Sequence, residues 1–69
     1  MKMSARNQLK GKVKSFKQGA VMAEVVVALP DGQEVVSAIT LGSFKELDFK
    51  TGDDVIVIIK STEVMLGKE

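Results

Sequence analysis

The alternation of apolar and polar residues near the start of the chain predicts a half-exposed β-strand. Between Gln8 and Phe16, one set of alternate positions holds Leu9, Gly11 and Val13, while the other holds three lysines and Phe16. A period of two residues is typical of a strand with one face toward a core. The pattern therefore places the lysines, and Phe16 with them, on the face in contact with solvent.

Turn signals divide the rest of the chain into further short strands. The expected strands cover residues 21–29, 34–40 and 54–59, with a short fifth strand over 64–66. Turns are expected between them at Lys17–Ala20, Pro30–Gln33 and Lys50–Asp53. In the first of these turns, Gly19 is expected to have a positive φ. Five short strands with closely spaced turns favour a small antiparallel barrel, closed or partly open.

One short helix is expected between the third and fourth strands. Ser43-Phe44-Lys45-Glu46 has the spacing of a capping box, with Ser43 as the N-cap and Glu46 three residues later. Phe44 and Phe49 flank this helix and are expected in the core. For Thr40, at the end of the third strand, two roles stay open: a hydroxyl donor to a ligand, or an ordinary strand residue. The predicted fold is all-β, in one domain over residues 1–69.

Two apolar runs, Val25–Val27 and Val55–Ile59, do not alternate. Strands of this kind are usually buried on both faces, but a barrel of 69 residues has only one interior. The outer faces would otherwise form an apolar patch that soluble monomers seldom carry. We therefore expect a homo-oligomer in which another subunit covers these faces. Cover by a loop or by the C-terminal tail is the alternative.

The composition narrows the chemistry further. The chain has neither His nor Cys, so we expect neither catalysis nor a metal held directly by side chains. The net charge of +1 is too balanced for a protein that neutralises many phosphates, and no Trp or Tyr lies among the lysines of residues 10–17. No apolar run approaches the ~20 residues of a membrane span, and no signal-peptide pattern opens the chain. A cytoplasmic protein is expected.

Two polar segments at opposite ends of the chain carry the most informative chemistry. Ser4–Gly11 contains Arg6, and Ile59–Thr62 contains Lys60 beside two hydroxyl residues. A guanidinium, an ammonium and hydroxyl groups can all donate hydrogen bonds, which suits a small tetrahedral oxyanion. A pocket lined by donors rejects hydrogenphosphate, whose O–H finds no acceptor, whereas sulfate must be excluded by cavity size. For either segment alone, a solvated strand-end cation is the alternative interpretation.

Four segments together resemble the molbindins, also called molybdenum-pterin-binding proteins, whose domain recurs in molybdate-responsive regulators and molybdate transport ATPases. The segments are Ser4–Gly11, Ala23–Val25, Ala38–Thr40 and Val57–Val64. The resemblance implies a five-stranded barrel akin to the oligonucleotide-binding (OB) fold, assembled as a hexamer from three dimers. It also implies molybdate or tungstate, bound between subunits as cargo rather than as a catalytic cofactor, and a role in storage or buffering.

Carried over by position, the resemblance assigns the main oxyanion site to Ser4, Ala5, Arg6, Thr40, Lys60 and Ser61. It implies a second site on a symmetry axis, which we place at Lys17, Gly19, Ala20 and Val21. Pterin binding is not expected, because the composition offers no flat, aromatic-lined pocket. An OB-type nucleic-acid-binding barrel is the main alternative, and an oligomer with a purely structural role is another.

Overall fold

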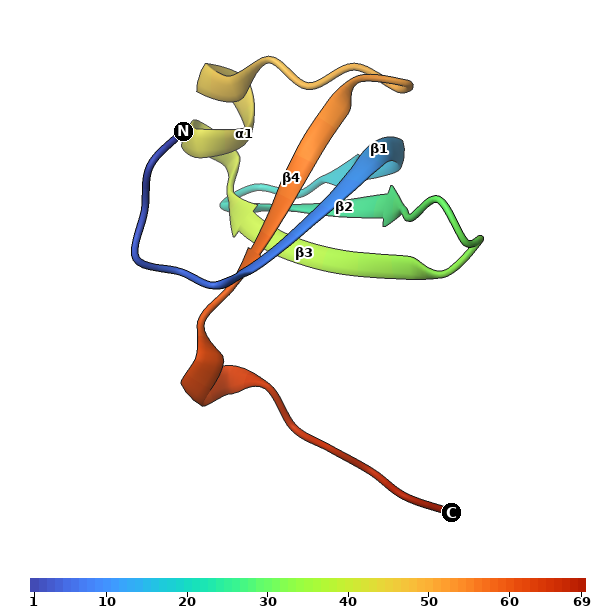
Figure 1. Cartoon of the computed structure of the whole chain (residues 1–69). Coiled ribbons are helices and arrows are strands. Elements are labelled where there is room, and N and C mark those ends of the chain that lie inside the picture. Colours follow the sequence, from blue (N-terminus) through green and yellow to red (C-terminus); the bar gives the residue numbers. More distant parts are fainter.

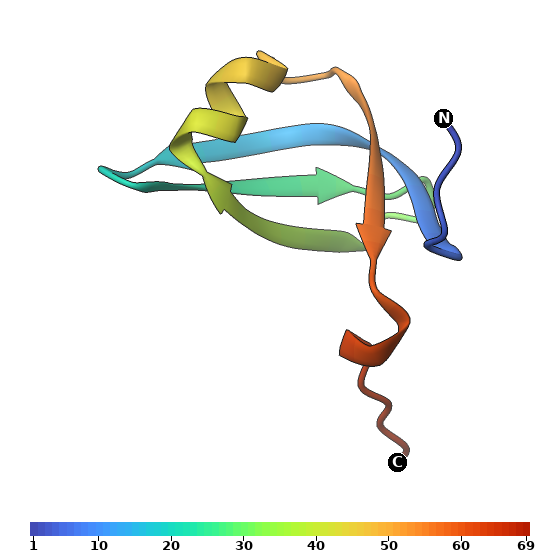
Figure 2. The same ribbon diagram turned by 90° about the vertical axis from the view of Figure 1, so that its left-hand side faces the viewer.

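The computed structural model describes all 69 residues and contains one curled antiparallel sheet (Figure 1). The elements are β1 (Asn7–Gln18), β2 (Met22–Ala28), β3 (Glu34–Thr40), helix α1 (Leu41–Leu47), β4 (Asp54–Ile59) and the 3₁₀ turn η1 (Ser61–Glu63). The strand order across the sheet is β3-β2-β1-β4. Viewed from the side, β4 stands steeply against the other strands and α1 lies over the curl (Figure 2). The predicted all-β architecture, with one short helix before the fourth strand, is confirmed.

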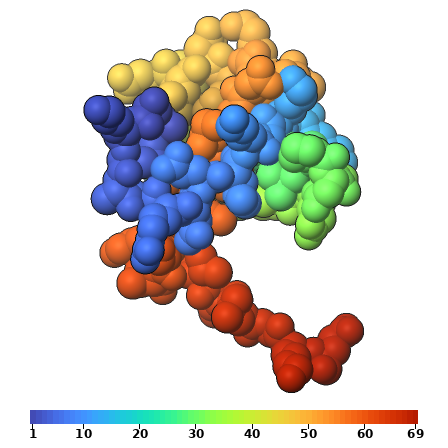
Figure 3. Space-filling model, in the orientation of Figure 1, coloured from blue at the N-terminus to red at the C-terminus, as the bar shows by residue number.

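The predicted fifth strand is not formed. Residues 64–66 have no regular structure, and Met65 and Leu66 are 92% and 94% exposed. After η1 the chain runs away from the body of the molecule (Figures 1 and 3). A strand needs a hydrogen-bonding edge beside it, and this segment lies beside none. The fold is therefore a half-barrel of four strands, in which β3 and β4 each have a free edge.

A bulge in β1 changes which of its residues face the core. Val13 lies opposite Val27, but Ser15 lies opposite the next residue, Val26, so one residue of β1 is extra. Beyond the bulge, Phe16 lies opposite the buried Val25 and contacts Phe44, with ring centroids 4.9 Å apart. Phe16 therefore contacts the core side of the sheet, which strict alternation does not predict because it assumes unbroken pairing, but its side chain is still 38% exposed to solvent.

The core of the single chain is small. Its buried side chains are Val13, Ala23, Val25, Val27 and Phe44. Phe49 packs partly against them, with its ring centroid 6.2 Å from that of Phe44. The chain exposes 5704 Å², whereas a compact monomer of 7.4 kDa exposes about 4,200 Å². The half-barrel therefore leaves much more surface uncovered than a protein of this size usually does.

Two of the turns predicted from the sequence are confirmed, whereas the predicted φ of Gly19 and the predicted N-cap of the helix are wrong. In the turns predicted at 30–33 and 50–53, Gly32 and Gly52 have φ values of 90° and 95°, whereas Gly19 is not among the residues with positive φ. The N-cap of α1 is Thr40 rather than Ser43: the Oγ1 atom of Thr40 accepts a hydrogen bond of 3.1 Å from the backbone N–H of Ser43. The helix thus starts earlier than the predicted capping box requires.

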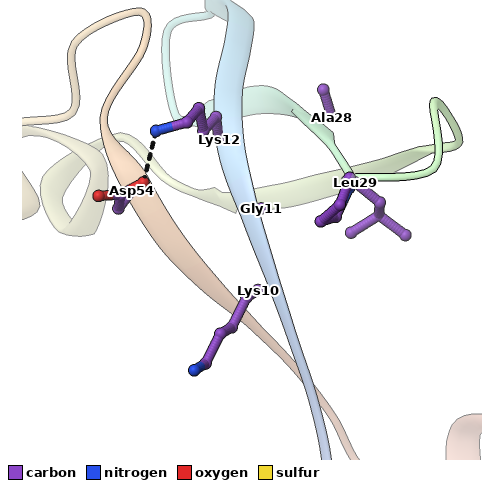
Figure 4. A pocket seen from close by; sticks show the side chains of 7 residues that line it. Lys10, Gly11, Lys12, Ala28, Leu29 and Asp54 are labelled. Carbon is purple, nitrogen blue, oxygen red and sulfur yellow. Dashed lines mark hydrogen bonds and ion pairs between the residues drawn. The ribbon is translucent and has the colours of Figure 1, made fainter.

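Gly11 lies on β1 beside the end of β2, next to Ala28 and Leu29 (Figure 4). A Cβ atom added to Gly11 would lie 2.6 Å from Cγ1 of Val27 and 2.7 Å from the carbonyl oxygen of Ala28. The second atom belongs to the backbone and cannot turn aside. Any side chain at this position therefore forces the two strands apart.

We predict that Gly11→Ala destabilises the protein by about 1–3 kcal/mol, because the added methyl group overpacks the strand interface. The matched control is Gly42→Ala in α1, where an added Cβ meets nothing within 4 Å and where alanine favours the helix. Urea unfolding of both variants, at one fixed protein concentration, measures the difference. Equal stabilities for the two variants would contradict the prediction.

Candidate functional site

Pairing between β1 and β4 brings the two polar ends of the chain together. The last pair of this antiparallel ladder joins Asn7 to Ile59. Arg6 and Lys60 are the next residues, one before β1 and one after β4. The two cations singled out in the sequence thus leave the same end of the same strand pair, although they lie far apart in the chain.

A hollow lies at this end of the strand pair. Its lining residues are Ser4, Ala5, Ile58, Lys60, Ser61 and Thr62. Four of the six residues assigned to the main site, Ser4, Ala5, Lys60 and Ser61, therefore share one cavity. The volume of about 460 Å³ is far larger than a tetrahedral oxyanion fills, so one chain alone does not enclose such a ligand.

The donor groups at the hollow have no partner within the chain. No side-chain hydrogen bond or ion pair involves Ser4, Arg6, Lys60, Ser61 or Thr62. The lining contains no carboxylate. Gln8 steadies the segment before β1, because its Nε2 atom donates to the carbonyl oxygen of Ala5 at 2.6 Å. The result is a set of free donors on a braced backbone.

Arg6 and Thr40 lie outside this hollow. Arg6 is exposed and does not line the cavity. Thr40 lies opposite Met22 in the β2–β3 ladder, and the backbone N–H of Leu41 donates to the carbonyl oxygen of Val21 at 2.8 Å. Thr40 is therefore beside the β1–β2 turn, with its hydroxyl group engaged in capping α1. A single chain does not bring it to Lys60.

The residues proposed for a second site are only partly gathered. Lys17 and Gly19 line a shallow hollow with Gln18, Met22, Ala23, Glu24 and Ala38, whereas Ala20 and Val21 are exposed outside that lining. Glu24 lies directly opposite Lys17 in the β1–β2 ladder. A carboxylate in this position opposes the binding of an anion, so the hollow is not lined by donors alone.

Two of the four lysines on β1 are in ion pairs. Lys12 contacts Asp54 at 2.7 Å and Lys14 contacts Glu34, and Figure 4 shows the first of these pairs. The hydrogen bond from Lys12, and then its charge, lower the pKa of Asp54. Lys12 and Lys14 therefore contribute less free positive charge than the sequence suggests, whereas Lys10 and Lys17 are in no ion pair. Outside β1, a hydrogen bond to Asp48 raises the pKa of Lys50.

Two lining residues, Ile58 and Thr62, are not among the residues that the resemblance assigned to the main site. Thr62 belongs to the polar segment Ile59–Thr62, whose two hydroxyl residues the sequence analysis had already singled out as donors. Ile58 belongs to an apolar run, and nothing in the sequence connects an isoleucine with an anion. The structure contains no cluster of three or more carboxylate residues that could hold a metal ion, and it has no helix of the length and apolar character needed to cross a membrane.

Comparisons with known proteins agree with one another. Residues 3–66 match the TOBE domain. The chain is 50% identical over 66 residues to molybdenum-pterin-binding protein 3 of Clostridium pasteurianum, an alignment that covers 96% of this chain and 97% of that protein. It is 46% identical over 69 residues to a probable molybdenum-pterin-binding protein of Haemophilus influenzae, with both chains fully covered. The solved molybdate-binding protein from Sporomusa ovata has a TM-score of 0.92 at 43% identity, over 99% of this chain and all of that one.

We predict that Thr40→Ala destabilises the protein by about 1 kcal/mol, because α1 loses its N-cap. Thr40→Ser keeps the hydroxyl group and should stay close to the natural protein. The control is Thr51→Ala, an exposed turn position without a side-chain hydrogen bond, where a change below about 0.5 kcal/mol is expected. The prediction fails if denaturant unfolding shows equal stability for Thr40→Ala and Thr51→Ala.

Proposed function

The chain belongs to the TOBE domain family, and from that premise we propose that it binds molybdate or tungstate and stores the anion within a homo-oligomer. The observation that carries this proposal is the convergence of unpartnered donors at the end of the β1–β4 pair. Relatives that match the whole chain are named for molybdenum binding. Their names, the fold and the donor set point to the same class of ligand.

The donor set suits a dianion because it can compensate the free energy that is lost when the dianion leaves water. A desolvated dianion needs opposite charge and needs its lone pairs occupied. Arg6 and Lys60 supply the charge, and the hydroxyl groups of Ser4 and Ser61 supply hydrogen bonds. Charge-assisted bonds of this kind are stronger than bonds between neutral groups. The chain is a binder rather than an enzyme, since these groups include no pair of nucleophile and base.

The site is completed between subunits in our proposal. The hollow is too large for the ligand, Arg6 lies outside it, and Thr40 is on another part of the chain. A neighbouring copy that places its own Arg6 over the hollow would add the missing guanidinium donors, whereas the hydroxyl group of Thr40 could add a hydrogen bond only by giving up the one it donates to Ser43 at 2.8 Å. It would also exclude water, which strengthens each remaining interaction.

Self-association has separate support in the uncovered surface. The chain exposes about 1,500 Å² more than a compact monomer of its mass, and a standard interface buries about 800 Å² per partner. A seam runs between β3 and β4 at the two free edges of the sheet, and nine of its ten lining residues are apolar. The exposed residues 64–66 of a second copy would fit this seam as the missing strand. A hexamer built from dimers is consistent with such exchange.

The nucleic-acid alternative has weaker support. Lys12 and Lys14 are engaged in ion pairs along β1. Phe16 and Phe44 pack against each other, so their rings are not free platforms for stacking bases.

We predict that equilibrium dialysis retains molybdate on the natural protein and that Arg6→Ala weakens binding by about 2 kcal/mol or more, through loss of a charge-assisted pair. Lys2→Ala removes an equal charge from the same exposed segment and should leave the affinity unchanged. Parallel dialysis experiments with tungstate and sulfate show which other oxyanions the protein binds. Retention of molybdate by Arg6→Ala at natural affinity would remove Arg6 from the site.

We predict that sedimentation at micromolar concentration shows an assembly larger than the monomer. The double substitution Met65→Asp with Leu66→Asp should shift the protein toward smaller species, because it puts charge on the apolar tail. The control is Lys68→Asp, which lies close to Met65 and Leu66 and lowers the net charge by the same amount as the double substitution. It should leave the assembly intact. A stable monomer of the natural protein would refute self-association.

A further inference from the structure

One side chain connects the polar hollow with the apolar seam. Ile58 lines the hollow of Ser4 and Lys60, and it also lines the seam between β3 and β4. No other residue lines both. It lies on β4 opposite Gln8, and it is 48% exposed. The two cavities therefore share one lining residue, an isoleucine on a paired strand.

Ile58 differs from every other lining residue of the hollow. Ser4, Ser61 and Thr62 carry small hydroxyl groups that rotate, Ala5 has a single methyl group, and Lys60 has a long, flexible chain. Ile58 is the one large apolar group, and its β-branch restricts rotation about χ1. Rotating donors can follow anions of different size, but this wall cannot.

Donors alone do not separate molybdate from sulfate. Both are tetrahedral dianions that accept hydrogen bonds in every direction, so the difference left to the protein is size. A gap of a fraction of an ångström already forfeits much of the attraction between atoms in contact. Size selection therefore needs a lining group that stays in place when a smaller anion enters.

We propose that Ile58 is a specificity-determining residue, an apolar wall that limits the size of the oxyanion hollow once a second subunit closes it and that favours molybdate over sulfate. The inference rests on the proposed function, since it concerns the same site. The seam on the other side of Ile58 supports the wall once a second subunit fills it. Ile58 gives no hydrogen bond and no charge, so shortening it changes the size of the cavity and leaves the donor set intact.

The test is a calorimetric titration with molybdate, alone and in competition with sulfate, on the assembled natural protein, Ile58→Val and Ile58→Ala. We expect Ile58→Ala to lower the ratio of molybdate to sulfate affinity by about tenfold, the usual scale for removing apolar bulk from a pocket. Ile58→Val should lower it less. An unchanged ratio in Ile58→Ala, even with both affinities reduced, would overturn the proposal.

Ile56→Ala is the matched control, because Ile56 lines the seam but not the hollow. Its affinity ratio should equal that of the natural protein, and an equal fall in both variants would overturn the proposal. If Ile58→Ala does not assemble, Ile58→Val, which removes a single methyl group, carries the test, and its ratio must also fall. Failure of the natural protein to bind molybdate would instead refute the proposed function, so the two failures are distinguishable.

Discussion

The antiparallel pairing of β1 with β4 is the constraint on which the site depends. It alone places the segment before Asn7 beside the segment after Ile59. For β4 to reach β1, the chain must leave β3 at the opposite edge of the sheet and pass through α1. Phe44 anchors α1 in the core, and Thr40 fixes where the helix begins. Buried apolar packing therefore positions the donors, although no buried residue lines the hollow.

The open hollow and the open seam have a common cause. Four strands curl without closing, so one end of the β1–β4 pair stays wide and two strand edges stay free. Closing the barrel with part of a second copy would satisfy the free edges and cover apolar surface in one step. In the proposed assembly the same closure removes water from the donors. Ligand affinity and assembly would then depend on each other, because desolvated charge pairs are worth more than solvated ones.

The sequence patterns predicted correctly those features, such as tight turns, that depend only on a few neighbouring residues. The turns at Gly32 and Gly52 follow from the conformations that these residues adopt with little strain. The strand predicted at residues 64–66 is not formed, and the contact of Phe16 with Phe44 was not predicted, because both depend on pairing partners that no single stretch of sequence contains. The donor chemistry of the two polar ends was predicted from their residues, but their approach within one chain was not, because it depends on strand order; the resemblance implied sites between subunits. Ile58 was not predicted as a lining residue because the prediction was based on hydrogen-bond donors, and an isoleucine side chain has none.

The mobile and the restricted parts of the lining affect binding differently. The exposed side chains of Lys60 and Ser61 can adjust to a dianion, but ordering them on binding costs conformational entropy. Selectivity between two dianions improves when part of the lining does not move. A strand satisfies this requirement better than a loop, because its backbone is held by a ladder of hydrogen bonds. The hollow combines both: its donors come from the segments that flank the β1–β4 pair, and its one rigid wall comes from β4 itself.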